Sequence, residues 1–164
     1  MRKTLFLDRD WVINKKAPEG EYVYSLDKFQ RNDKAQELIR LCKENFWLVI
    51  VVTNQQGIWK GLYSYNDVEK IHDKIQYDLW VHKIDGFFVC PHLIMDNCAC
   101  RKPKPGMIYN ALDKFSSIDK QSALLIGDST TDIEAAKAAG IKSIKIDSDW
   151  LSEHFEYICT MLKI

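Results

Sequence analysis

Two aspartates, Asp8 and Asp10, follow directly on a short apolar run near the start of the chain. The run, residues 4–7, has the composition of a buried strand, and alternate residues of a strand point the same way. Both carboxylates could therefore face one site, where a hard divalent metal would offset their charge. Asp8 would then act as a nucleophile and Asp10 as an acid/base, whereas a solvated turn is the simpler interpretation of an isolated pair.

Polar residues also follow two further predicted strands. Thr53 and Asn54 come after the apolar run 46–52, where a hydroxyl and free backbone amides could bind a phosphate, although a plain strand-to-helix turn is equally consistent. Asp128 follows the predicted strand 122–127 and could complete a metal site. Asp132, one helical turn later, would support that site or merely cap the helix.

Three thiols and one imidazole lie within eleven residues, at Cys90, His92, Cys98 and Cys100. These are the ligands of a tetrahedral structural zinc site, and four protein ligands leave no open position for chemistry. The alternative, chance clustering of buried cysteines, is the poorer explanation because the segment 90–100 has no helical or strand pattern. The zinc is therefore predicted to hold this loop in place.

A basic segment follows the predicted zinc loop directly, with Arg101 and Lys102 next to Pro103 and Pro105. The two prolines stiffen the backbone, so the cations are expected to be held in place. A fixed ammonium can neutralise a transferring phosphoryl group, and a guanidinium can hold a second anion. A solvated basic loop is the alternative.

The hydrophobic pattern alternates between strands and helices, which predicts a doubly wound, mostly parallel, Rossmann-like α/β sheet. The expected strands are 4–7, 46–52, 85–90, 122–127 and 141–146, and the expected helices are 32–44, 65–81, 107–115, 133–139 and 150–162. Residues 14–28 are expected to form a long loop at the functional end of the sheet. Cys42 and Cys159 are expected in the core, and His72 and His82 at the surface or as helix caps.

Length and composition suit one domain, residues 1–164. The 23 basic and 23 acidic residues balance, so nothing in the net charge predicts binding to nucleic acid. No apolar stretch is long enough for a signal peptide or a membrane span. In a reducing compartment, the three crowded cysteines favour metal binding over disulfides. We therefore expect a cytoplasmic monomer that does not bind membranes.

The polar clusters, taken in order, resemble the four motifs of the haloacid dehalogenase-like phosphatase superfamily over nearly the whole chain. The run Thr-Asn-Gln-Gln-Gly-Ile at 53–58, the cysteine/histidine loop and the run Cys-Arg-Lys-Pro-Lys-Pro-Gly-Met at 100–107 resemble one branch. That branch contains D-glycero-D-manno-heptose 1,7-bisphosphate phosphatases and histidinol-phosphatases. The larger members of the superfamily carry a cap domain, for which this chain has no room. Trp11 stands where members usually have glycine.

The resemblance implies a role for each matching residue. Asp8 would form an aspartyl-phosphate, and Asp10 would protonate the leaving oxygen and then activate water. Magnesium would be bound by the Asp8 carboxylate, the Asp10 backbone carbonyl and Asp128, with Asp132 in support. The phosphoryl group or the rest of the substrate would be bound by Thr53, Asn54, Arg101 and Lys102.

The leading substrate that the resemblance implies is heptose 1,7-bisphosphate, converted to heptose 1-phosphate for lipopolysaccharide or capsule synthesis. Histidinol phosphate is the alternative within the enzyme class. From another class, the chain could be a phospho-acceptor signalling module, since receiver domains also combine aspartates, threonine and lysine. It could also be an inactive binding protein, an alternative that Trp11 motivates. Asp10 distinguishes a phosphatase from a receiver domain. An acid/base two residues after the nucleophile promotes hydrolysis of the aspartyl-phosphate, whereas a receiver domain stores it.

Overall fold

The computed structural model describes residues 1–15, 17–18, 21–147 and 150–164 of the chain. A five-stranded sheet forms its centre, with the strand order β3-β2-β1-β4-β5, and every neighbouring pair is parallel. The strands are β1 (Arg2–Leu7), β2 (Leu48–Asn54), β3 (Gly86–Cys90), β4 (Ile118–Gly127) and β5 (Lys142–Lys145). The expected parallel α/β sheet is confirmed.

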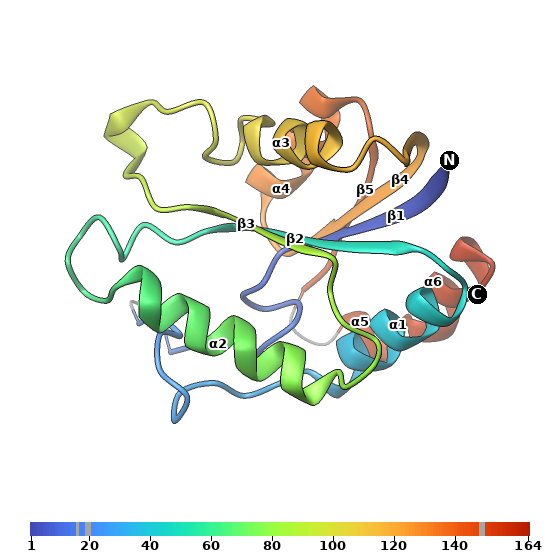
Figure 1. Ribbon diagram of the computed structural model, residues 1–164, viewed down its shortest axis with the longest axis horizontal. Coiled ribbons are helices and arrows are strands. Elements are labelled where there is room, and N and C mark those ends of the chain that lie inside the picture. Colours follow the sequence, from blue (N-terminus) through green and yellow to red (C-terminus); the bar gives the residue numbers. More distant parts are fainter. Residues whose placement is uncertain (16, 19–20, 148–149) are drawn as a thin grey trace.

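Helices cover both faces of the sheet, as Figure 1 shows. One face packs against α1 (Asp33–Glu44), α2 (Tyr65–Asp78), α5 (Trp150–Glu153) and α6 (Phe155–Leu162), and the other against α3 (Gly106–Lys114) and α4 (Thr130–Ala139). Alternate strand residues supply the two cores, because Leu5 and Leu7 of β1 face one side and Phe6 faces the other. The sheet is therefore doubly wound, as the hydrophobic pattern predicts.

Local signals set the helix ends that matter for the site. The Asn32 side chain accepts hydrogen bonds from the first amides of α1. Ser64 and Asp67 form a capping box at α2, and Ser129 and Asp132 form another at α4. Gly140, with φ of +70°, ends α4 in the left-handed region. These caps fix the residues at which α1, α2 and α4 begin and at which α4 ends.

Several predicted boundaries differ from the structure. The strand predicted at 46–52 begins at Leu48, because Phe46 has a φ of +62° and is 82% exposed. It also runs on to Asn54, so Thr53 lies within the strand. The strand predicted at 122–127 begins at Ile118, and the closing helix predicted at 150–162 is broken at His154 into α5 and α6.

The prediction of a surface or capping role for His72 is wrong. The His72 ring is buried and stacks on the ring of Phe87 in β3, with 4.1 Å between ring centroids. Cys42 and Cys159, by contrast, lie in the core as expected.

The segments after β1 and β2 have the compact form expected of a capless member. Among the described residues between β1 and α1, and between β2 and α2, the structure contains turns and isolated bridges but no further helix or sheet strand. Residues 16, 19 and 20 of the loop predicted at 14–28 lie outside the described residues. Among the helices of the described residues, none has the length and apolar character needed to span a membrane.

Candidate active site

Three charged side chains from distant parts of the chain meet beneath the carboxyl end of the sheet. The Lys102 Nζ atom lies 3.0 Å from Asp8 Oδ2 and 2.6 Å from Asp132 Oδ1. It also donates a hydrogen bond of 2.9 Å to the Val52 carbonyl. The side chains of Lys102 and Asp132 are 2% and 0% exposed. Asp8 follows β1 and Asp132 lies in α4, so the parallel sheet brings the predicted motifs together.

The buried carboxylates outnumber the buried ammonium. Burial raises the pKa of Asp8 to about 7; the Lys102 ammonium opposes this shift, and the charges of Asp132 and Asp10 add to it. Burial, followed by the charge of Asp132, raises the pKa of Asp128. The pKa of Lys102 is raised, because attraction by Asp8 and Asp132 outweighs the effect of burial. The site therefore has an excess of negative charge that a cation would neutralise.

Asp8, Asp128 and Asp132 each bring a carboxylate oxygen within 4.8 Å of the others, a spacing that could hold a metal ion. Asp132 already accepts hydrogen bonds from the Ser129 hydroxyl, at 2.7 Å, and from the Ser129 amide, at 3.0 Å. It also pairs with Lys102. Both Asp132 oxygens are thus engaged by groups of the chain, which fits the supporting role expected for Asp132.

Asp10 is held by donors on several sides. The Arg9 Nη2 atom lies 2.9 and 3.0 Å from its two carboxylate oxygens. Asn14 Nδ2 donates to Asp10 Oδ1 at 3.1 Å, and Gln55 Nε2 donates to Oδ2 at 2.7 Å. The Arg9 guanidinium is fully buried and also donates to the Val23 carbonyl. The Asp10 carboxylate is thus fixed in one orientation.

Sequence reasoning missed Arg9, Asn14 and Gln55 as parts of the site. Arg9 lies between two aspartates that were already of interest, and a buried arginine requires a charged partner. That burial is set by the packed structure and is not visible in the local sequence. Nothing in the local sequence marks Asn14 or Gln55 as partners of Asp10.

Thr53 and Asn54 have different environments. The Thr53 hydroxyl is buried at the end of β2 and accepts a hydrogen bond of 3.0 Å from Gln55 Nε2. The Asn54 side chain donates to the Lys102 carbonyl and accepts from the Lys102 amide, both at 3.1 Å. Asn54 therefore fixes the backbone of the basic segment.

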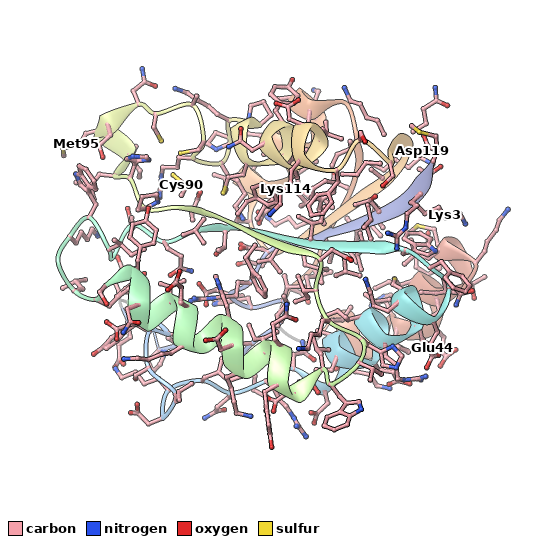
Figure 2. All side chains as sticks on the ribbon, viewed as in Figure 1. Lys3, Glu44, Cys90, Met95, Lys114 and Asp119 are labelled. Carbon is pink, nitrogen blue, oxygen red and sulfur yellow. The ribbon has the colours of Figure 1, made fainter. Side chains whose placement is uncertain are left out.

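The predicted zinc ligands converge. Figure 2 shows Cys90 where β3 ends and Met95 at the outer tip of the same segment, which includes the short helix η1 (Ile94–Asp96). The Sγ atoms of Cys90, Cys98 and Cys100 lie 3.2–3.6 Å apart, and His92 Nδ1 lies 3.3 Å from Cys100 Sγ and 3.6 Å from Cys90 Sγ. Zinc–sulfur bonds of about 2.3 Å in a tetrahedron put sulfur atoms about 3.8 Å apart. The donor set therefore fits one tetrahedral ion.

Arg101 joins this cluster to the turn after β2. Its Nη1 atom donates to the His92 carbonyl at 3.1 Å, and Nη2 donates to Gln56 Oε1 at 3.4 Å. A cavity of about 420 Å³ opens beside it, between the cysteine/histidine segment and α4. It is lined by Asn54, Asn97, Arg101, Lys102, Lys104 and Thr131 among others. Three cationic residues therefore line the cavity, and one of them, Lys102, pairs with Asp8.

The backbone at Trp11, directly after Asp10, has a φ of +69°. This left-handed conformation favours glycine and costs a larger residue roughly 1–2 kcal/mol. The positive φ at this position accounts for the glycine that members of the superfamily usually have here. In this chain tryptophan occupies that left-handed position.

Comparisons with known proteins agree with this geometry. A family model described as "Haloacid dehalogenase-like hydrolase" matches residues 68–146. The D-glycero-alpha-D-manno-heptose-1,7-bisphosphate 7-phosphatase of Campylobacter jejuni is 38% identical over 144 residues, which cover 87% of this chain and 80% of the relative. The D-glycero-beta-D-manno-heptose-1,7-bisphosphate 7-phosphatase of Pasteurella multocida is 34% identical, over 87% of this chain and 80% of the relative.

A solved structure of a related phosphatase is also similar to this chain. The D,D-heptose 1,7-bisphosphate phosphatase of B. bronchiseptica, crystallised with magnesium and phosphate, matches with a TM-score of 0.80 and 34% identity. The match covers 86% of this chain and 78% of that one. Sequence, fold and the converging acidic and basic residues agree, and the chain belongs to the heptose 1,7-bisphosphate phosphatase family of haloacid dehalogenase-like hydrolases.

Proposed function

We propose that this protein is a magnesium-dependent phosphatase that removes the 7-phosphate of D-glycero-D-manno-heptose 1,7-bisphosphate. The observation that carries the proposal is the buried group Asp8, Lys102 and Asp132, beside Asp128 and Asp10, in a chain of this family. The relatives named above act on this sugar phosphate, as either the alpha or the beta anomer. The product, heptose 1-phosphate, would serve the synthesis of surface polysaccharide precursors in the cytoplasm.

The residues present fit a magnesium ion. Two carboxylates, those of Asp8 and Asp128, have a pKa raised by burial, which a divalent cation between them would reverse. Asp8, Asp128 and the backbone carbonyl of Asp10 would hold the ion. Bound there, magnesium would supply charge neutralisation for the phosphoryl group.

The chemistry would proceed in two steps on this chain's own side chains. An oxygen of the Asp8 carboxylate attacks phosphorus, and the bond from phosphorus to the sugar oxygen breaks. That oxygen keeps the electron pair and takes the proton of the Asp10 carboxyl group. Asp10 then removes a proton from a water molecule whose oxygen attacks the same phosphorus. The Asp8–phosphorus bond breaks, which restores both carboxyl groups.

The neighbouring polar groups would stabilise the charge that moves during these steps. Lys102 already lies 3.0 Å from Asp8, so its ammonium would lie next to the oxygens of the transferring group. The Thr53 hydroxyl would donate to the same oxygens. Arg101, held by the His92 carbonyl, would bind the part of the substrate away from the reaction centre.

The cysteine/histidine cluster would hold a structural zinc ion through Cys90, His92, Cys98 and Cys100. All three cysteines are free thiols, and their spacing matches a tetrahedral site. Because Arg101 donates to the His92 carbonyl, the zinc would fix the position of a substrate-binding cation.

The proposal is tested by measuring phosphate release with magnesium from both heptose bisphosphate anomers and from histidinol phosphate. Asp8→Asn is the blank, since it keeps the shape of the side chain and removes the nucleophile. We expect one heptose anomer to be turned over much faster than histidinol phosphate, and the blank to be silent. Preference for histidinol phosphate, or equal turnover by the blank, would contradict the proposal.

A further inference from the structure

We propose that Gln55 is a positioning residue for the acid/base Asp10, and that the Tyr63 hydroxyl holds the Gln55 amide in the orientation this requires. The inference rests on the proposed function and extends it to two residues outside the predicted motif roles. It also links the acid/base to the aromatic segment that contains Tyr22 and Tyr24.

The Gln55 side chain is 2% exposed, and all its polar atoms are engaged. Nε2 donates to Asp10 Oδ2 at 2.7 Å and to Thr53 Oγ1 at 3.0 Å. Oε1 accepts from the Tyr63 hydroxyl at 2.7 Å, and the backbone amide donates to the Cys90 carbonyl at 2.7 Å. The Gln55 side chain thus joins the acid/base to Thr53 at the end of β2 and to Tyr63, while its backbone amide binds the end of β3.

The orientation of the amide matters because its two ends have opposite roles. A carboxylate only accepts hydrogen bonds, so Nε2 must face Asp10 and Oε1 must face away. Without a donor, Oε1 would be a buried acceptor with no partner, which is unfavourable. The Tyr63 hydroxyl supplies that donor. Burial raises the pKa of Tyr63, so its hydroxyl keeps the proton it donates.

Tyr63 is itself held in place by tight packing. Its ring stacks on the Tyr24 ring, with 5.4 Å between centroids and 8° between planes, and lies 5.8 Å from the Tyr22 ring. Gly57 leaves the space that the ring occupies, because a Cβ atom there would lie 2.0 Å from Tyr63 Cε1. The Tyr22 hydroxyl accepts from Lys60 Nζ at 3.0 Å. The loop that follows β1 therefore supports the Tyr63–Gln55–Asp10 chain of contacts.

Gln55 is one of three residues whose side chains donate hydrogen bonds to the Asp10 carboxylate, and it makes the shortest of these bonds, at 2.7 Å to Oδ2. Arg9 binds both carboxylate oxygens and is fully buried, so its position is fixed. Loss of the Gln55 donor would leave Asp10 held by Arg9 and Asn14 alone. The Oδ2 atom would lose its shortest hydrogen bond, and the carboxyl group would be less well aligned with the leaving oxygen that it must protonate.

The test compares two leaving groups in the magnesium-loaded enzyme. The sugar oxygen of heptose bisphosphate needs a proton to leave, whereas p-nitrophenolate leaves without one. The ratio kcat/KM reports the steps up to release of the leaving group, and so isolates this proton transfer. We expect Gln55→Met to lower kcat/KM about 30-fold or more for the heptose and less than about 3-fold for p-nitrophenyl phosphate.

Tyr63→Phe removes only the hydroxyl and is the milder variant, with an expected loss of about tenfold on the heptose alone. Gly57→Ala should act like it, because the added Cβ displaces the Tyr63 ring. Tyr109→Phe is the matched control. It removes a hydroxyl that donates to the Ala138 carbonyl on the α3–α4 side, and it should leave kcat/KM unchanged for both substrates.

Three results would overturn the inference. Equal losses on both substrates in Gln55→Met and Tyr63→Phe would show a general structural role. Unchanged kinetics in both variants would show that Asp10 does not need them. A wild-type protein inert toward both substrates would contradict the proposed function and this inference with it. That outcome is distinguished from the other two because the wild type is active in both of them.

Discussion

Replacing Lys102 with methionine should destabilise the protein strongly while changing little of its shape. The variant keeps the length of the side chain but removes the ammonium between Asp8, at 3.0 Å, and Asp132, at 2.6 Å. Removing one partner of a buried ion pair typically costs about 3–5 kcal/mol, because the other charge stays buried without compensation. For a chain of this length, each kcal/mol corresponds to about 2–4 °C in Tm. We therefore expect Tm to fall by roughly 6–20 °C.

Thermal unfolding followed by circular dichroism, in buffer without magnesium, measures this effect. The two carboxylates can take up protons once the ammonium is gone, so the gap between variant and wild type should widen as pH rises. Lys104→Met is the matched control, since that ammonium is bonded at the exposed Asn97 carbonyl and its loss should cost less than about 0.5 kcal/mol. A Lys102→Met protein that melts within about 2 °C of wild type would refute the electrostatic reasoning.

Three further predictions concern other parts of the molecule. Burial, with the charge of Arg9, lowers the pKa of His72 to about 3, so the folded state holds it neutral and loses stability as pH falls below the unfolded value of about 6.5. This cost reaches about 2 kcal/mol at about pH 5. His72→Phe should remove it in acid unfolding curves, and an unchanged pH dependence would contradict the assignment. Purified protein should contain about one zinc per chain, and a strong chelator should lower Tm. A zinc content below about half an ion per chain would contradict the proposed structural zinc site. Gly127→Ala should be unstable and inactive, because the new Cβ would lie 2.3 Å from Asp132 Cγ; a variant with wild-type Tm and turnover would show that Asp132 can move freely.

The polar clusters were predictable because a parallel sheet collects the ends of its strands at one edge. Asp8 follows β1 and Asp128 follows β4, two strands that pair directly, so their convergence follows from the topology. The cysteine/histidine cluster was predictable for a different reason. Its four ligands are close in sequence, and the donor types themselves indicate the metal.

Other features depend on contacts that the local sequence does not contain. Arg9 is buried because its guanidinium reaches the Val23 carbonyl, 14 residues further along, as well as Asp10. His72 adjoins the apolar face of α2, but its stacking on Phe87 depends on how α2 lies across β3. Asn54 follows Thr53 directly, yet its side chain turns to the Lys102 backbone, 48 residues away. Each of these cases required the packed structure.

The most direct measurement follows both phosphates of heptose 1,7-bisphosphate by phosphorus NMR, in the presence of magnesium, with wild-type protein and Asp8→Asn. We expect the signal of the 7-phosphate to disappear with the wild type, while the 1-phosphate signal remains and free phosphate rises in equal amount. Asp8→Asn should leave both signals unchanged. Loss of the 1-phosphate first, or hydrolysis by Asp8→Asn at the wild-type rate, would contradict the proposed substrate position or the proposed nucleophile.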